Sequence, residues 1–272
     1  MSALQAIILG LVQGLTEFLP ISSSGHLRIV PALLGWEDPG AAFTAVIQLG
    51  TMAAVLVYFR ADLWRIARAW LAELRVPFRR RSTDANLGWF ILLGTIPISI
   101  FGIAFSDQIE SGARDLYLIG SMLIAFSFVM LAAEHYGKRE REIKTMNGRD
   151  GIFIGFAQAL ALIPGVSRSG ATISAGLLRN FDRAAAARYS FLLSVPAVVL
   201  SGLYELKDIG GGEDSVSTSA TIIAALVAFA SGYAAIAWLL RYLAHHSLNV
   251  FVAYRIPLGI LVIALTASGA IS

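Results

Sequence analysis

The sequence contains no cysteine and few charged residues. Because none of the 272 residues is cysteine, disulfides and thiolate chemistry are excluded. Charged residues make up 14% of the chain, whereas a soluble domain usually carries about 25%. Hydrophobic residues make up 57%, and the mean hydropathy is +0.70. These values predict an integral membrane protein.

The sequence also lacks the common motifs of soluble enzymes. It contains no P-loop, no His-Glu-x-x-His pair and no Gly-x-Ser-x-Gly elbow. The net charge of +3 is small and the basic residues are clustered, which indicates an orientation signal and not a nucleic-acid partner. A chemical function must therefore come from polar residues inside the apolar segments.

Six apolar stretches reach the length of about 20 residues that a bilayer requires. They are residues 40–59, 86–105, 116–134, 185–204, 219–239 and 250–270. Two further apolar segments, 3–35 and 151–180, are interrupted by a polar loop. Each of these predicts a re-entrant helix–loop–helix hairpin, whose loop is tolerated only inside protein or a wet cavity. The expected fold is an all-α polytopic membrane protein with a single integral membrane domain, 1–272.

The charges between the stretches predict the orientation. Segment 60–84 contains seven arginines, 135–150 contains five basic residues, and 240–249 contains Arg241. Segments 106–115 and 205–218 contain one basic residue each. The positive-inside rule makes the first three loops cytoplasmic and the last two external. Traced from these loops, hairpin 3–35 enters from outside and hairpin 151–180 from inside.

The two hairpins also resemble each other in sequence. At a constant offset of 145, residues 6–25 and 151–170 match at seven of twenty positions. With the opposite orientations, this match predicts an inverted-topology repeat, each half being one hairpin plus three spans. Repeat 1 covers about 1–135 and repeat 2 about 150–272, and such folds place their sites where the broken helices meet. The alternative is a chance match between apolar segments rich in glycine and serine.

Glu17 is the first candidate site residue, because an ionisable group inside an apolar segment is costly to bury. Gln13 precedes it by four residues and shares its helical face. Together they predict a metal site or a general acid or base. The alternative is a carboxylate at a helix end that faces water.

His26 follows the run Ser22-Ser23-Ser24-Gly25. A histidine at this place can shuttle a proton or attack phosphorus directly. A capping or core histidine is the alternative. Arg28, two residues on, either contacts phosphates or lies at the membrane interface.

Arg168 lies in a second polar loop, where an arginine is suited to bidentate phosphate contact. Gly165 allows a tight turn, and a helix is expected to begin near Ala171, so its N-terminal amides can bind an anion. Hydroxyl donors come from Ser167, Ser169 and Thr172. The alternative is an arginine that snorkels to the interface.

Other polar and aromatic residues are given structural roles. Glu134 and Glu205 lie at the ends of predicted spans and are expected to be solvated. Tyr58, Trp64 and Trp89 lie near predicted interfaces, where an aromatic belt is expected.

Residues 13–26, Gln-Gly-Leu-Thr-Glu-Phe-Leu-Pro-Ile-Ser-Ser-Ser-Gly-His, resemble the first signature of the bacterial undecaprenyl-diphosphate phosphatase family, also known for bacitracin resistance. Residues 164–172 resemble its second signature, Pro-Gly-x-Ser-Arg-Ser-x-x-Thr. The resemblance covers nearly the whole chain. The family has Glu or Gln at the start of the first signature, so with Gln13 the charge here rests on Glu17 alone.

The resemblance implies a multi-pass hydrolase of the bacterial plasma (inner) membrane, with its site open to the periplasmic side. It would convert undecaprenyl diphosphate to undecaprenyl phosphate and inorganic phosphate, recycling the lipid carrier for peptidoglycan, with Mg²⁺ or Ca²⁺ as cofactor. The site residues expected on this basis are Glu17, His26, Ser23 and Arg168 for catalysis, Ser22, Ser24, Gly25, Gly165, Ser167, Ser169 and Thr172 for substrate binding, and Glu17 with Gln13 for the metal.

Several alternatives stay open at this point. His26 acts either as the nucleophile or as the base that activates Ser23 or water. The same inverted-repeat site suits a transporter or flippase of a prenyl phosphate lipid, and a structural subunit is a third class. The oligomeric state, a homodimer included, and the identity of the metal are not fixed by the sequence.

Overall fold

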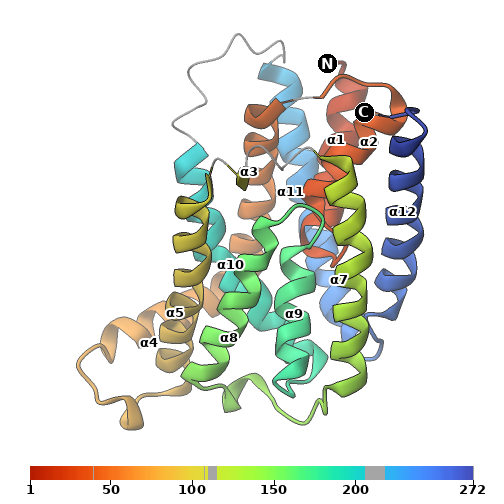
Figure 1. The fold of residues 1–272 in the computed structure, drawn as a ribbon. Helices are drawn as coiled ribbons and strands as arrows, with labels where there is room; N and C mark the ends of the chain where they lie inside the picture. Colours follow the sequence, from red (N-terminus) through yellow and green to blue (C-terminus); the bar gives the residue numbers. More distant parts are fainter. Residues whose placement is uncertain (39, 107, 110–114, 206–217, 272) are drawn as a thin grey trace.

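The computed structural model describes residues 1–38, 40–106, 108–109, 115–205 and 218–271, and in these residues it contains helices but no strand. Figure 1 shows most helices running side by side along one direction. The α-helices are α1 Ala3–Phe18, α2 Ser23–Leu34, α3 Gly40–Tyr58, α4 Arg60–Ala72, α5 Thr83–Ala104, α7 Leu116–Tyr136, α8 Gly148–Ala159, α9 Arg168–Leu178, α10 Arg183–Glu205, α11 Thr218–Leu243 and α12 Asn249–Ala267.

The predicted spans are confirmed as helices. In the described part of the chain, α5, α7, α10, α11 and α12 are long and apolar enough to cross a membrane. The remaining predicted span is α3, which qualifies only together with α4, and the two are bent by 72°. The chain is therefore a multi-pass membrane protein. The predicted external segments 106–115 and 205–218 lie mostly outside the described residues.

The segment 60–84, expected as a loop, instead begins with helix α4. Alanine, leucine and arginine favour helix, and Ile66 on α4 is buried against the core. Figure 1 shows α4 projecting sideways from the lower end of the bundle. The arginine-rich segment is thus partly a structured element that packs on the protein.

Both interrupted segments form helix pairs, α1–α2 and α8–α9, and their first helices begin in the same way. Ser2 and Gln5 form a capping box at the start of α1, and Asn147 and Asp150 form one at the start of α8. These positions are again 145 residues apart. A short 3-10 helix, Leu160–Leu162, extends α8 toward its loop.

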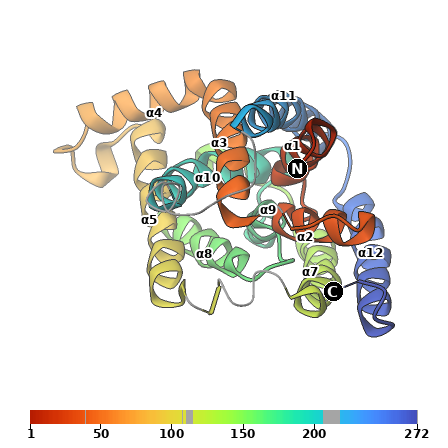
Figure 2. The same ribbon diagram turned by 90° about the horizontal axis from the view of Figure 1, so that it is seen from above.

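The helix pairs pack closely on spans of the other half of the chain. A Cβ on Gly10 of α1 would come within 2.4 Å of the Ala224 carbonyl oxygen on α11. A Cβ on Gly155 of α8 would come within 2.5 Å of the Gly94 carbonyl oxygen on α5. Glycine therefore allows close backbone approach at both contacts, as in other membrane helix pairs. Figure 2 shows α1 beside α11 and α8 beside α5.

The expectation that Glu134 is solvated is wrong. This carboxylate at the end of α7 is only 7% exposed. It accepts hydrogen bonds from the guanidinium groups of Arg183 and Arg139 and from the backbone amide of Leu248. The end of α7 is covered by the connection before α12, so the carboxylate is paired instead of hydrated. The Glu205 side chain lies outside the described part.

Candidate functional site

Two loops of the same local structure lie at the breaks in the helix pairs. The breaks themselves are Leu19–Ser22 and Ile163–Ser167. Together with the helix ends on either side, residues 17–26 and 162–171, they are called the first loop and the second loop. Ser22 and Ser167, the N-caps of α2 and α9, have φ angles of 75° and 76°. This left-handed backbone is uncommon for serine. Both loops therefore hold the same costly turn, and such strain is concentrated at functional sites.

The caps also make equivalent hydrogen bonds. The Ser22 hydroxyl accepts from the Gly25 amide at 3.3 Å, and the Ser167 hydroxyl accepts from the Gly170 amide at 3.2 Å. The Ser22 hydroxyl is hydrogen-bonded to the hydroxyl of the exposed Ser24. In the same way, the Ser167 hydroxyl is hydrogen-bonded to the Ser169 hydroxyl in the second loop. Helix α9 thus begins at Arg168, three residues before the expected position, because Ser167 supplies the cap.

The structure brings the two loops together, as the sequence predicted. The guanidinium of Arg168 donates a hydrogen bond to the carboxylate of Glu17 across 151 residues of chain. The hydroxyl of Ser169 donates to the carbonyl oxygen of Leu19 at 3.1 Å. The Glu17 and Arg168 side chains are 10% and 17% exposed, so the pair is largely shielded and still reachable.

Glu17 is held by three donors. Besides Arg168, its carboxylate accepts from the Ser23 hydroxyl at 2.5 Å and from the Gln13 side-chain amide at 3.2 Å. The buried Gln13 amide also donates to Thr51 on α3 at 3.3 Å. A carboxylate, a hydroxyl and a guanidinium therefore meet at one point, with Ser23 placed to lose its proton to Glu17.

His26 is buried beside this group but points elsewhere. Its Nδ1 lies 2.7 Å from the Ser22 carbonyl oxygen, and its Nε2 lies 2.7 Å from the Tyr254 hydroxyl. A carbonyl oxygen only accepts, so Nδ1 carries the hydrogen, and in the neutral ring Nε2 accepts from Tyr254. The two rings are stacked. His26 thus fixes the first turn of α2 against α12.

Arg255 on α12 joins the two loops, and the sequence analysis missed it. Its fully buried guanidinium donates to the Pro20 carbonyl oxygen at 3.1 Å and to the Gly165 carbonyl oxygen at 2.9 Å. It also donates to the Leu123 carbonyl and the Ser127 hydroxyl on α7. The available signal was a lone arginine inside the apolar stretch 250–270, since a charge in a span is rarely without function. Tyr254 gave no comparable signal.

Gly165 is required by the close approach of the second loop to α7. Its φ is +92°, and a Cβ there would come within 2.6 Å of the Ile119 carbonyl oxygen. Thr172 lies one turn inside α9, where its hydroxyl donates to the Arg168 carbonyl oxygen at 2.8 Å and is 2.5 Å from the Ser190 hydroxyl on α10. The Arg28 guanidinium lies 3.8 Å from the Asp38 carboxylate.

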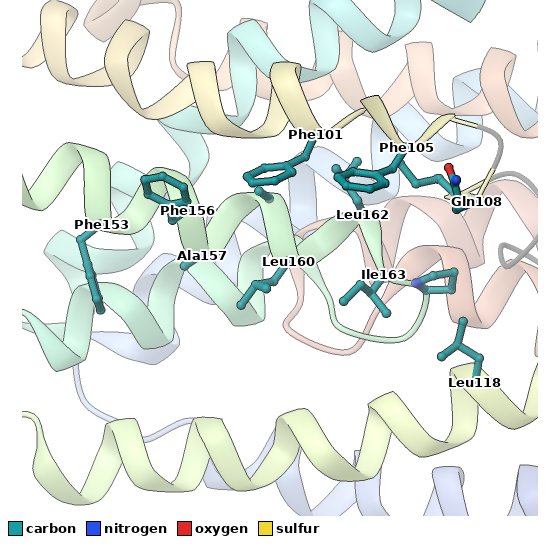
Figure 3. Close-up of a pocket in the computed structure, with 13 residues that line it drawn as sticks. Phe101, Phe105, Gln108, Leu118, Phe153, Phe156, Ala157, Leu160, Leu162 and Ile163 are labelled. Atoms are coloured by element: carbon teal, nitrogen blue, oxygen red, sulfur yellow. The ribbon is translucent and has the colours of Figure 1, made fainter. Parts of the chain in front are cut away.

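An apolar cavity of about 620 Å³ lies beside the second loop. Figure 3 shows it between α5, the α8 end and α7, lined by Phe101, Phe105, Phe156 and Leu118. Pro164 belongs to the lining and directly precedes Gly165. Ile163 and Pro164 of the second loop thus line the cavity a few residues before Arg168.

The chain matches the family described as Bacitracin resistance protein BacA over residues 6–261. A relative from Nocardioides, named undecaprenyl-diphosphatase, is 56% identical over 99% of this chain and 98% of its own length. Relatives with the same name from Thermobifida fusca and Mycolicibacterium smegmatis are 54% and 51% identical over 100% of this chain, covering 93% and 99% of their own lengths. The chain therefore belongs to the BacA family of bacitracin resistance proteins.

Proposed function

We propose that this protein hydrolyses undecaprenyl diphosphate to undecaprenyl phosphate and inorganic phosphate, which recycles the lipid carrier for peptidoglycan in the bacterial plasma membrane. The observation that carries the proposal is the contact of Glu17 with both Ser23 and Arg168. Relatives at 50% identity or more bear the name of this activity. A flippase or transporter of the same lipid is not favoured by these names.

In this proposal Arg168 and the amides at the starts of α2 and α9 bind the diphosphate. The guanidinium offers paired donors to phosphate oxygens, and helix N-termini attract anions. Arg168 would exchange part of its contact with Glu17 for the transferring phosphoryl group, whose charge it stabilises in the transition state. Ser24 and Ser169 supply further hydroxyl donors at the two helix starts.

Ser23 is the nucleophile in this scheme. Its Oγ forms a bond to the terminal phosphorus while its proton passes to Glu17, 2.5 Å away. The bond from phosphorus to the bridging oxygen breaks, and undecaprenyl phosphate leaves with the proton from Glu17. Water then attacks the phosphorus of the phosphoserine and gives a proton to Glu17. The bond from phosphorus to the Ser23 oxygen breaks, and Glu17 returns the proton to that oxygen as inorganic phosphate leaves.

His26 is a positioning residue in this scheme. The sequence left two roles open for His26, nucleophile and base. Its contacts support neither role, because both ring nitrogens are hydrogen-bonded, one to Ser22 and the other to Tyr254. We propose that it holds the first turn of α2 so that Ser23 faces Glu17.

The oxygen donors of the site fit a hard divalent cation such as Mg²⁺ or Ca²⁺. Glu17 offers its carboxylate, and the Gln13 carbonyl oxygen accepts no hydrogen bond within the described residues. No cluster of three acidic, histidine or cysteine side chains occurs in that part of the chain, and Mg²⁺ typically uses one or two carboxylates plus substrate phosphates. When bound, the cation would offset charge on the diphosphate oxygens.

We also propose that the two halves are inverted repeats, each with a re-entrant helix pair, and that the site opens to the periplasmic side. This is supported by the offset of 145 shared by the capping boxes and the loop caps. It is further supported by Gly120 and Gly259, which approach each other between α7 and α12, the third spans of the two halves. The site would then lie at the repeat interface.

The apolar cavity beside the second loop suits part of the prenyl chain. The surrounding lipid tails are as apolar as the cavity, so the hydrophobic effect would not favour transfer of the prenyl chain into it. The cavity would therefore distinguish prenyl chains only by their shape. Filling it with Ala157→Phe should raise KM for the long substrate and leave KM for a short prenyl diphosphate unchanged. An equal rise for both substrates would place the tail elsewhere.

Phosphate release from the purified protein in detergent tests the activity, because a pure transporter releases none. Ser23→Ala should abolish release, whereas Ser24→Ala should retain most of it. Brief reactions with labelled substrate should leave an acid-stable phosphate on Ser23. An acid-labile label on His26 would refute the proposed nucleophile and keep the activity.

A further inference from the structure

Helix α4 presents three different faces. Leu63, Ile66 and Trp70 face the protein, where Trp70 packs on Gly88 and its ring lies 5.4 Å from that of Trp89. Asp62, on the same side, pairs with Arg188 of α10 at 2.6 Å. These contacts fix the helix and leave its other two faces uncovered.

One uncovered face is apolar. Trp64, Ala67 and Leu71 follow one another at helical spacing, and Trp64 and Leu71 are 71% and 60% exposed. Phe78, in the turn after the helix, is 51% exposed. Large apolar side chains left in this way at the end of a membrane bundle mark contact with lipid or another protein.

The other uncovered face and the following turn are basic. Four arginines here are exposed and are called the surface arginines: Arg68, Arg75, Arg79 and Arg80. In the described part of the chain, none of their guanidinium groups has a hydrogen bond or an ion pair, although the backbone amide of Arg80 donates to the Pro77 carbonyl oxygen. The neighbouring acids are engaged elsewhere, since Glu73 accepts from the Ser82 amide at 2.6 Å and Asp84 pairs with Arg65 at 2.8 Å. The basic charge is therefore unbalanced.

We propose that α4 and the turn after it form a membrane-surface anchor that binds anionic phospholipid headgroups through the surface arginines. The 72° bend after α3 turns α4 away from the direction of the span, and Figures 1 and 2 both show it lying along the edge of the bundle. An apolar face beside a basic face is the pattern of a helix in the interface plane. Basic charge next to a membrane surface attracts anionic lipids.

The absence of cysteine makes the depth of α4 directly measurable. Ala67→Cys on the apolar face and Ala61→Cys on the polar face carry the same fluorescent label, and both alanines are exposed. In vesicles of phosphatidylcholine and phosphatidylglycerol, the label at position 67 should be quenched by a nitroxide lipid. The label at position 61 should be quenched by aqueous iodide. Equal quenching of both labels by iodide, or cross-linking of two chains through position 67, would overturn the anchor.

A charge-matched pair of triple variants tests the lipid headgroup. The first is Arg75→Gln with Arg79→Gln and Arg80→Gln. The control is Lys138→Gln with Arg149→Gln and Arg241→Gln, which removes three exposed basic charges elsewhere on the chain. Each arginine near a membrane surface contributes roughly a fivefold gain in affinity, so the first variant should lose roughly a hundredfold for phosphatidylglycerol.

The readout is emission from the label at position 67 as phosphatidylglycerol is titrated into phosphatidylcholine vesicles, with phosphate release in detergent as the folding control. The first variant should need far more phosphatidylglycerol, and the control variant should respond as the parent does. Equal shifts in the two variants, or no dependence on phosphatidylglycerol in the parent, would refute the proposal. Because neither variant touches the Glu17 group, the result is independent of the proposed hydrolysis.

Discussion

The first and second loops have the same backbone and different chemistry. Each begins a helix with a serine in the left-handed region, at φ angles of 75° and 76°. At the offset of 145, Glu17 corresponds to Leu162 and His26 to Ala171, whereas Arg168 corresponds to Ser23. The shared backbone positions two helix starts near one point. The reactive groups are divided, so neither loop holds a complete set alone.

This division explains why the loops must be held together accurately. In the proposed mechanism, the acid and the nucleophile come from one loop and the arginine from the other, so a small shift between them would separate the reacting groups. Arg255 supplies the connection through one carbonyl oxygen in each loop.

Removing the Glu17 carboxylate or the Arg168 guanidinium should have the largest effect. Glu17→Gln keeps the shape of the side chain and removes its ability to accept the Ser23 proton, and Arg168→Lys removes the paired donors. Each should lower kcat for phosphate release by about 10² to 10³-fold. Near-normal activity in either variant, with the protein folded, would mean that the two loops do not form one site.

Breaking the link between the loops should have the next largest effect. Arg255→Met leaves the buried Pro20 and Gly165 carbonyl oxygens without this donor, at a cost of about 3 kcal/mol in total. Thermal unfolding in detergent should show the loss, and kcat should fall with it. Arg255→Lys should restore part of both. A fall in stability with unchanged kcat would limit Arg255 to a structural role.

Equivalent glutamines in the two halves should differ in effect. Gln13 bonds Glu17, whereas Gln158 at the same repeat position has weaker contacts. Its Nε2 donates to the Gly94 carbonyl oxygen at 3.5 Å, and its buried Oε1 has no hydrogen-bond partner among the described residues. Gln13→Leu should lower activity about tenfold by freeing the Glu17 carboxylate. Gln158→Leu should leave activity unchanged, and it should not lower stability because it removes an unsatisfied polar atom. Equal losses of activity would contradict the division of roles.

The first turns of α1 and α8 should differ in their response to acid, and this effect should be the smallest. Burial raises the pKa of Asp150, but hydrogen bonds from Arg141, Arg179 and the Asn147 amide outweigh it and hold the pKa below its usual range. Asp150 lies in the first turn of α8, outside the candidate spans. A depressed pKa stabilises the fold above the unfolded pKa of about 3.9, and the stabilisation is lost as the pH falls through and below that value.

Amide hydrogen exchange measures this difference between the first turns of α1 and α8. On acidification to about pH 3, amide protection in the first turn of α8 should decrease. Protection in the first turn of α1 should not, because the neutral Gln5 takes the place of Asp150 in that capping box. Equal loss in both turns would indicate general acid unfolding.

Much of the fold could be predicted because its signals are local. The apolar runs predicted the span helices, and the serine-glycine loops predicted the breaks in the two helix pairs. The prediction of α4 as a loop was wrong because its arginines outweighed its apolar stripe in the orientation argument. Glu134 was placed in water because its partners Arg183 and Leu248 are distant in sequence.

The membrane class, the span helices and the two matched loops could be predicted without a structure, and Glu17 and Arg168 could be named as candidate site residues. These follow from composition and spacing, since each segment must satisfy its own backbone and bury its own apolar face. Which of these groups meet depends on the packing of the helices. Glu17 contacts Ser23 while His26 turns to Tyr254, and Arg255 reaches Pro20 across 235 residues. Such partners depend on how distant helices pack, and no local pattern encodes that packing.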